Sequence, residues 1–208
     1  MKNNVIKRKY SHGISLMEVL VTMIIILIGL LGIVALQAKA HVAELEAYQR
    51  SQALIILSDI VDRINVNRAT ASCFNITTNT TAGTPYLGDI TGGGHYNTAT
   101  DCTAATSAYN TMAKQTLVDI DNLLQGSAES LGGSNVGAMI GARACISYDS
   151  ASELSGVAGT GLYTIIVTWQ GMSGGLVSPT EMKCAVGLYG DETKRRAVST
   201  SFRLANLY

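Results

Sequence analysis

The sequence predicts an α+β fold in which one long amino-terminal helix packs on a small antiparallel β-sheet. Residues 14–68 contain no proline and show first a membrane-like and then an amphipathic pattern, whereas three strand-like segments all lie after residue 143. Four cysteines follow the apolar segment, so disulfides are expected to close a loop between the helix and the sheet.

The first part of the chain is a short basic segment. Residues 1–13 include four Lys and Arg residues and no Asp or Glu, and an uncharged apolar run extends from Val19 to Ala38. By the positive-inside rule the basic segment stays in the cytoplasm, so we expect residues 14–38 to cross the inner membrane once as a helix. The sequence predicts a leader (1–13), a transmembrane helix (14–38) and a globular domain outside the cytoplasm (39–208).

A small-residue junction, Gly13-Ile14, lies before the apolar run, whereas an ordinary secretory signal is cleaved after it. Cleavage at this junction removes the charges, keeps the membrane helix and makes Glu18 the fifth residue of the mature chain. A carboxylate beside hydrocarbon costs several kcal/mol and usually marks a function or a partner. The simpler alternative places Glu18 at the headgroup boundary of a plain anchor.

This combination of leader charge, Gly13, Glu18 and apolar run resembles the class III leader of type IV pilins and type II secretion pseudopilins. The resemblance implies a type IV pilin-like fold and cleavage by a prepilin peptidase between Gly13 and Ile14. It also implies methylation of the Ile14 amine and pairing of Glu18 with the terminal ammonium of a neighbouring subunit. Ile14 departs from the more usual Phe at its position.

The long helix is expected to reach about Arg68, which makes it roughly 80 Å long at 1.5 Å per residue. Its second half carries apolar residues at spacings of three and four, the pattern of a face buried against a domain. These residues are Val42, Leu45, Ala53, Ile56, Leu57, Ile60, Val61 and Ile64.

Beyond the helix, residues 70–110 are rich in Thr, Ala, Asn and Gly and are expected to form an exposed loop. A second helix is expected over Thr111–Gln125. Strands are expected over Ala144–Tyr148, Tyr163–Gln170 and Ala197–Leu204, with Cys184–Leu188 as a fourth strand or a loop. Gly- and Ser-rich segments at 155–161 and 171–178 suit hairpin connections, which gives an antiparallel meander on the carboxyl half of the long helix.

The four cysteines, Cys73, Cys102, Cys145 and Cys184, are expected to form two disulfides in an oxidising compartment. Their spacings match no zinc pattern, so no metal site is predicted. The sequence allows three connectivities. We favour Cys73 with Cys102, which would close the polar loop, and Cys145 with Cys184, which would tie the sheet.

A more specific resemblance lies in the helix and the tail. The run Leu27-Ile28-Gly29-Leu30-Leu31-Gly32-Ile33-Val34-Ala35-Leu36-Gln37-Ala38-Lys39 is similar to that of the PilV family of minor pilins, also called type IV pilus modification proteins. Cys145-Ile146, Val167-Thr168-Trp169-Gln170-Gly171, Cys184, Tyr189-Gly190 and Arg195-Arg196 resemble the carboxyl-terminal pattern of that family. The small pseudopilin GspI of type II secretion is the alternative within the same class.

Two tail features have simpler structural interpretations. Trp169 is expected to pack in the core or at the sheet edge rather than to bind a ligand. Arg195-Arg196 is expected to be a solvated start of a strand, with contact to a neighbour's carboxylate as the alternative.

The net charge argues against a nucleic-acid-binding protein, and the lack of catalytic motifs argues against an enzyme. Removal of the leader takes four of the fifteen basic residues and none of the fifteen acidic ones, which leaves a net charge of about minus four and no nucleic-acid footprint. An enzyme is not predicted, because His41 and His95 lie near no nucleophile motif and no catalytic motif occurs. No cofactor is expected. A tethered receptor or adhesin, with the disulfide loop as contact surface, remains the alternative of a different class.

The predicted function is that of a minor pilin that primes pilus assembly and is incorporated at or near the pilus tip, supporting adhesion or motility. The partners that the resemblance implies are other minor pilins, the major pilin, the prepilin peptidase, the inner membrane and a tip adhesin. A Gly- and Ala-containing membrane helix with one terminal carboxylate is suited to packing beside similar helices. We expect the chain in the inner membrane, with its carboxyl terminus in the periplasm, before assembly and on the cell surface afterwards.

Overall fold

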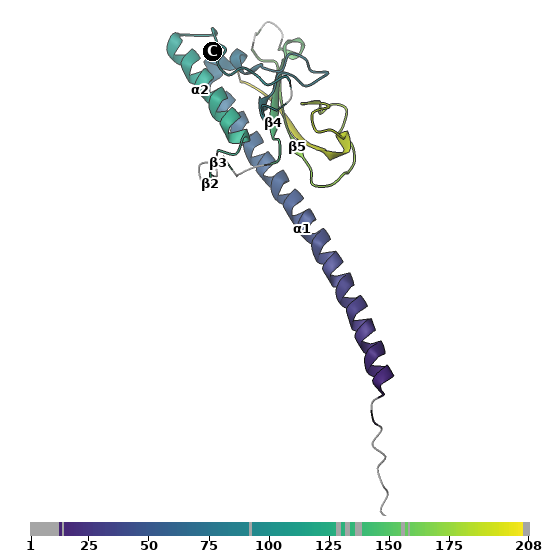
Figure 1. Ribbon diagram of the computed structural model, residues 1–208. Coiled ribbons are helices and arrows are strands. Elements are labelled where there is room, and N and C mark those ends of the chain that lie inside the picture. The colour runs from purple at the N-terminus through teal and green to yellow at the C-terminus, as the bar shows by residue number, and fades with distance from the viewer. Residues whose placement is uncertain are drawn as a thin grey trace, which may run out of the picture. The chain divides into compact units, whose positions relative to one another are not determined.

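The computed structural model describes residues 13, 15–91, 93–127, 130–131, 134–135, 139–154, 157 and 159–205. Two compact units, Met1–Glu44 and Leu45–Tyr208, are described separately below. The long amino-terminal helix and the four-stranded antiparallel sheet confirm the predicted α+β class (Figure 1). The expected division into 1–13, 14–38 and 39–208 stays a prediction, since the boundary between the units falls after Glu44.

Helix α1 spans Leu16–Val66 without interruption. The part in the second unit buries one face, as the three- and four-residue spacing predicted, and the buried residues are Gln49, Ala53, Ile56, Leu57, Ile60 and Ile64. The expectation that Val42 and Leu45 lie on this buried face was wrong, because both are exposed. Periodicity fixes the direction in which a side chain points, but burial also requires a packing partner at that point of the helix.

The sheet has the order β1-β4-β5-β6 and is antiparallel throughout. Its strands are β1 (Leu87–Gly88), β4 (Arg143–Asp149), β5 (Leu162–Gln170) and β6 (Arg195–Arg203). The last three agree with the expected strands to within one or two residues. The fourth strand is β1, whereas residues 184–188 form bends and turns. Cys184 is tied to the sheet by its disulfide and Ala185 has a φ of 51°, so this segment does not continue as a strand.

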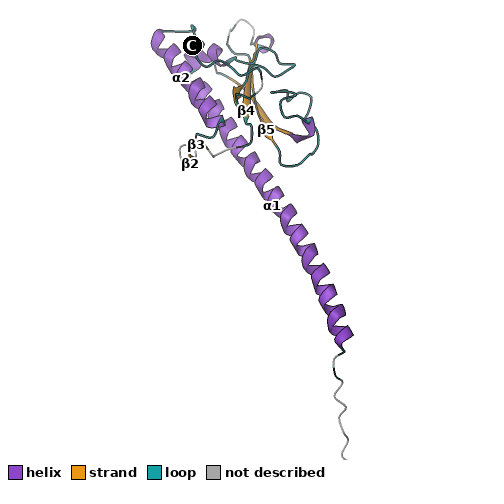
Figure 2. Ribbon diagram, in the orientation of Figure 1, coloured by secondary structure: helices purple, strands orange, loops and turns teal. Residues whose placement is uncertain are grey.

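The two faces of the sheet are buried by different parts of the second unit. On one face, residues such as Ile146, Ile165 and Val167 pack with α1 and α2 in the main core. On the other face, Cys145 and Ile166 pack with Tyr86, Cys184, Ala185 and Tyr189. This alternation follows from the two-residue period of a strand. Figure 2 shows the helices beside the strands and the loops that complete the unit.

Helix α2 (Ser107–Leu124) begins four residues earlier than expected and ends within one residue of the predicted position. It buries Ala113, Thr116, Leu117, Ile120, Asp121 and Leu124. The short elements are the 3₁₀ helices η1 (Arg68–Phe74), η2 (Ser150–Ser152) and η3 (Glu192–Lys194), and a two-stranded hairpin of β2 (Ser130–Leu131) and β3 (Ser134–Asn135).

The expectation that residues 70–110 form an exposed loop was wrong for part of this segment. Phe74, Ile76, Tyr86 and Leu87 are buried, and the segment contributes both η1 and the edge strand β1. The segment is mostly polar, and its few buried apolar residues, here called anchors, lie too far apart in the sequence to show a helical or strand period. Each of these anchors is buried by elements distant in the sequence, so the assignment depends on tertiary contacts.

Residues 171–194 do not form a tight hairpin connection, which corrects the expectation for 171–178. They make a long excursion between β5 and β6 that closes on itself, because Gly171 N–H donates to Lys194 O at 2.7 Å. The excursion packs over the face of the sheet opposite α1, where Cys184 is bonded to Cys145. A connection of this length is fixed by its hydrogen bonds and its disulfide to the sheet rather than by the geometry of a tight turn.

Candidate functional site

The first unit presents an apolar helix surface. The apolar side chains from Leu16 to Leu36 are exposed, and no part of the most apolar stretch of α1 is buried. Among the described residues α1 is the one helix long and apolar enough to cross a membrane. Such a surface is stable only in lipid or against other apolar helices.

Glu18 lies in the first turn of α1. The Ser15 hydroxyl accepts a hydrogen bond from Met17 N–H at 3.3 Å, and Ser15 O accepts from Glu18 N–H at 3.0 Å, so Ser15 closes the start of the helix. A carboxylate at this end of a helix is favoured by the helix dipole. Gly13 is exposed, whereas Ile14 lies outside the described residues. The roles predicted for Gly13, Ile14 and Glu18 therefore stay predictions.

The second unit contains two disulfides, Cys73 to Cys102 and Cys145 to Cys184, which is the pairing favoured from the sequence. The first joins η1 to the segment before α2. The second is fully buried and ties the excursion to the central strand β4. The two bonds thus hold down the two long irregular segments of the unit.

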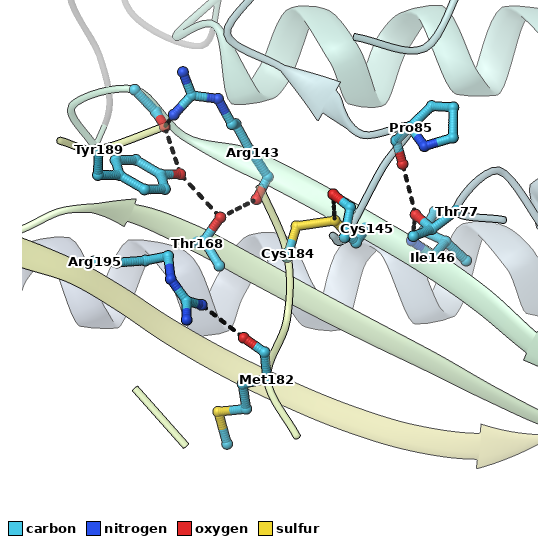
Figure 3. The surroundings of a disulfide bond; sticks show 12 residues. Thr77, Pro85, Arg143, Cys145, Ile146, Thr168, Met182, Cys184, Tyr189 and Arg195 are labelled. Atoms are coloured by element: carbon cyan, nitrogen blue, oxygen red, sulfur yellow. Dashed lines mark hydrogen bonds between the residues drawn. A yellow bond between two sulfur atoms is a disulfide. The ribbon is translucent and has the colours of Figure 1, made fainter. Parts of the chain in front are cut away.

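Figure 3 shows the surroundings of the second disulfide. The Tyr189 hydroxyl lies 2.9 Å from the Thr168 hydroxyl on β5 and donates to Gly141 O at 3.0 Å. Arg195 donates to Met182 O, so the start of β6 holds the excursion as well. The buried Tyr189 side chain has a raised pKa, mainly because burial disfavours the phenolate. These contacts stabilise the fold, and the disulfide, Tyr189 and Arg195 are all buried.

Arg143 is the most completely buried charge of the unit. Its side chain is 3% exposed and its guanidinium lies 3.0 Å from the Asp89 carboxylate. The rings of Tyr86 and Tyr189 flank it, at 5.4 and 4.6 Å from the guanidinium carbon. A cation between two aromatic faces and a carboxylate is well stabilised, so Arg143 ties β4 to both irregular segments.

The paired Arg195 and Arg196 differ from the expectation of a solvated strand start. The Arg195 side chain is 4% exposed and pairs with Glu192 at 2.6 Å. Arg196 donates to Glu46 on α1 at 3.3 Å and to Ser173 O at 2.9 Å. Both guanidinium groups therefore have a carboxylate partner within the unit, and contact with a neighbour's carboxylate stays a prediction. Trp169 is buried as expected, in the main core.

A cleft of about 720 Å³ lies between η1, the β4–β5 connection and the end of β6. Tyr148 and Tyr163 contribute aromatic rings to its wall, and Arg68 and Glu153 contribute opposite charges. Burial raises the pKa of Tyr163 to about 12. Hydrogen bonds from the Tyr148 hydroxyl and from Gly159 N–H lower the pKa of the Glu153 carboxyl. At neutral pH the Tyr163 hydroxyl is therefore neutral and the Glu153 carboxylate is ionised.

The described residues offer little for catalysis. They contain no group of three or more His, Cys, Asp or Glu side chains that could hold a metal ion. His95 lies 2.8 Å from Asp121, but that carboxylate already accepts from Gly88 N–H at 2.7 Å and from Gln125. His41 lies 3.7 Å from Glu44 on the exposed surface of α1. Of the described histidines, His95 belongs to a structural pair and His41 to a surface pair.

Two comparisons with family models agree with this architecture. Residues 8–34 match the model of the prokaryotic N-terminal methylation motif, and residues 35–116 match the Tt1218-like model, described as type IV pilin Tt1218. The two matches are contiguous and together cover slightly more than half of the chain. Both matches support the type IV pilin superfamily as the family of this chain. No curated protein and no solved structure gives a significant match to this pilin.

The superfamily is one of structural subunits, and its membership accounts for the exposed apolar half of α1. The methylation motif implies processing by a prepilin peptidase and assembly with other pilins. What the sequence analysis missed are the buried polar contacts of the pilin's second unit, Arg143 with Asp89 and Asp121 with Gly88. Arg143 directly precedes the expected strand Ala144–Tyr148, so a charge at the start of an apolar segment was the available signal.

Proposed function

We propose that this pilin is a minor pilin of the PilV type, which primes type IV pilus assembly and is incorporated at or near the tip. The observation that carries the proposal is the exposed apolar half of α1 with Glu18 in its first turn, within the segment that matches the methylation motif. A helix of this kind associates with similar helices, and one carboxylate at its start can neutralise a neighbour's terminal ammonium.

The direction of the chain in the membrane belongs to the same proposal. The basic leader supports a cytoplasmic amino terminus, and the two disulfides suit an oxidising periplasm for the second unit. Other minor pilins, the major pilin and a tip adhesin are the proposed partners. The alternative within the class is a GspI-like pseudopilin, which would assemble with type II secretion subunits instead.

Processing is tested by mass spectrometry of the membrane-bound chain from cells with and without the prepilin peptidase. We expect a mature chain that begins at Ile14 and carries one methyl group on its amine. An identical mass in both strains would defeat the assignment of a processed pilin and would favour a permanent tethered receptor.

Assembly is tested with Glu18→Ala, compared with Glu44→Ala as a control that removes an exposed carboxylate from the same helix. A close charge pair is worth about 4 kcal/mol at an effective dielectric constant near 20, so we expect Glu18→Ala to be strongly depleted from sheared fibres. Glu44→Ala should be incorporated normally. Equal incorporation of both variants would contradict the proposed role of Glu18. Recovery of the native chain with type II secretion subunits, and not with pili, would favour the pseudopilin alternative.

A further inference from the structure

The sequence contains two matches to the pattern Asn-X-Ser/Thr, which marks acceptors of N-linked glycans on the surface of proteins outside the cytoplasm. They are Asn75-Ile76-Thr77 and Asn79-Thr80-Thr81, and both lie between η1 and β1. A transferase that acts on the folded chain must reach both the asparagine amide and the hydroxyl two residues later. The two matches differ in whether the fold leaves these groups accessible.

The first match is built into the fold. Thr77 is 3% exposed, and its hydroxyl donates to Pro85 O at 2.7 Å and accepts from Ile146 N–H at 3.1 Å. Figure 3 shows this side chain beside Ile146 and the Pro85 carbonyl. The Asn75 carboxamide oxygen accepts from Tyr148 N–H at 3.1 Å, so the asparagine is engaged with β4 as well. The Thr77 hydroxyl is therefore out of reach in the folded chain.

The second match lies on an exposed turn. Residues 79–81 are all exposed, and the turn is closed by Asn79 N–H, which donates to Thr84 O at 2.9 Å. The base of the turn is tied to the excursion, because Gly83 O accepts from Ala185 N–H at 2.9 Å. The turn is thus a fixed projection of the second unit with its first residues in solvent.

The orientation of the Asn79 carboxamide is set by the turn. Its oxygen accepts from Thr81 N–H at 3.2 Å and from Ala82 N–H at 3.0 Å. A carboxamide is planar and has its acceptor and its donor at opposite ends, so these bonds direct the nitrogen away from the turn. Within the described ranges of the chain, neither this nitrogen nor the Thr81 hydroxyl has a hydrogen-bond partner. Both groups that the pattern requires are therefore accessible at the surface.

We propose that Asn79 is the acceptor of an N-linked oligosaccharide and that Asn75 is not modified. The donor is an oligosaccharide joined through a diphosphate to a membrane polyprenol. The Asn79 amide nitrogen attacks the anomeric carbon of the sugar and gives its proton to a base of the transferase. The bond between that carbon and the diphosphate oxygen breaks, and the lipid diphosphate leaves with the electron pair. The two N–H groups on the carboxamide oxygen stabilise the charge that this oxygen gains as the nitrogen loses its proton.

The inference rests on the proposed function in one respect, that the second unit lies outside the cytoplasm. The two disulfides of that unit support this location. The inference does not require that the chain be incorporated into a fibre, so the two proposals can fail separately.

Peptide mapping of the full-length chain from its own cells tests the inference. Arg68 and Lys114 are successive trypsin sites, so one peptide, residues 69–114, carries both matches. After reduction of the disulfide within this peptide, electron-transfer fragmentation between Asn75 and Asn79 assigns a sugar to one of the two. We expect a sugar mass on Asn79 and none on Asn75.

A matched pair of variants separates the pattern from the turn. Thr81→Ala keeps the backbone N–H that bonds the Asn79 carboxamide and removes only the hydroxyl, so this variant should lose the sugar completely. Thr81→Ser keeps the hydroxyl and should keep the sugar. Asn79→Gln should lose the sugar, and Asn75→Gln should retain it. Unchanged fluorescence of the buried Trp169 in each variant shows that the fold is intact.

The outcomes separate the two proposals. A native peptide 69–114 without sugar, a sugar on Asn75, or a sugar that persists in Asn79→Gln on a threonine would overturn the inference. An unmodified chain that is present in fibres would overturn the glycan and leave the minor pilin function standing. A chain that carries the glycan and is absent from fibres would overturn the minor pilin function and leave the glycan standing.

Discussion

The disulfide between Cys145 and Cys184 should contribute more to the stability of this pilin than the one between Cys73 and Cys102. Replacement of both partners by serine removes the bond in each case. The bond between Cys145 and Cys184 closes 39 residues, and the bond between Cys73 and Cys102 closes 29. In the chain-entropy model these loop lengths correspond to about 3.9 and about 3.6 kcal/mol at 25 °C, which differ little.

The larger difference in the expected contribution to stability comes from the surroundings of the two disulfides. Cys145 and Cys184 are 2% and 0% exposed and belong to the cluster that fixes the excursion on the sheet, whereas Cys73 and Cys102 are half-buried. Serine adds a hydroxyl group at each buried position; the one at 145 has Gly83 O within 3.3 Å, whereas an unpaired hydroxyl at 184 costs about 1–3 kcal/mol. We therefore expect the Cys145→Ser/Cys184→Ser variant to lose at least about 5 kcal/mol of unfolding free energy, and the Cys73→Ser/Cys102→Ser variant about 3–4 kcal/mol.

Urea unfolding of the full-length chain in detergent measures both values. Trp169, the one tryptophan of the sequence, is buried on β5 and reports the loss of the core by fluorescence. The test is which of the two double variants loses more unfolding free energy. A larger loss for the Cys73→Ser/Cys102→Ser variant, or a loss below about 1 kcal/mol for the buried pair, would refute the reasoning from burial and loop closure.

Three further predictions concern single residues. Gly83 has a φ of +66°, and a Cβ there would lie 2.3 Å from Cys184 Cα, so Gly83→Ala should cost clearly more than the 1–2 kcal/mol or so of a left-handed conformation alone; Gly187→Ala, with a φ of +79° and open space, is the control in thermal unfolding. Asp89→Ala should cost about 1.5–3 kcal/mol by leaving Arg143 buried without its carboxylate, whereas Asp101→Ala, which breaks an exposed pair with Lys114, should cost less than about 1 kcal/mol in the same urea titration. Because the pKa of Tyr163 is raised from 10.0 to about 12, its neutral hydroxyl stabilises the folded state fully below pH 10, and this contribution is lost as the pH rises towards 12; unfolding midpoints of Tyr163→Phe should fall less steeply over that range, and parallel curves would contradict the assignment.

The sequence determined the parts of this protein that depend on local pattern. An uncharged apolar run after a basic segment, and apolar spacings of three and four, are sufficient to place α1, because a helix needs only its own backbone bonds and one face to bury. Alternation over Tyr163–Gln170 and Ala197–Leu204 predicted β5 and β6, and the short segment Ala144–Tyr148 predicted β4. The same local features at Gly13, Ile14 and Glu18 led to the superfamily, which the two family matches support.

The tertiary structure decided which segments without a period are built into the core. Phe74, Ile76 and Leu87 lie in a polar stretch, and each is buried only because α1, α2 and β4 meet over it. Arg143 is buried beside the Asp89 carboxylate, which lies 54 residues away in the sequence and comes within 3.0 Å of it, whereas the partner of Arg195, Glu192, is local. The position of β6 at one edge of the sheet was also decided by the tertiary structure. Whether a strand is paired on one side or two depends on the order of strands in the sheet, and that order is set by long-range contacts that no local pattern records.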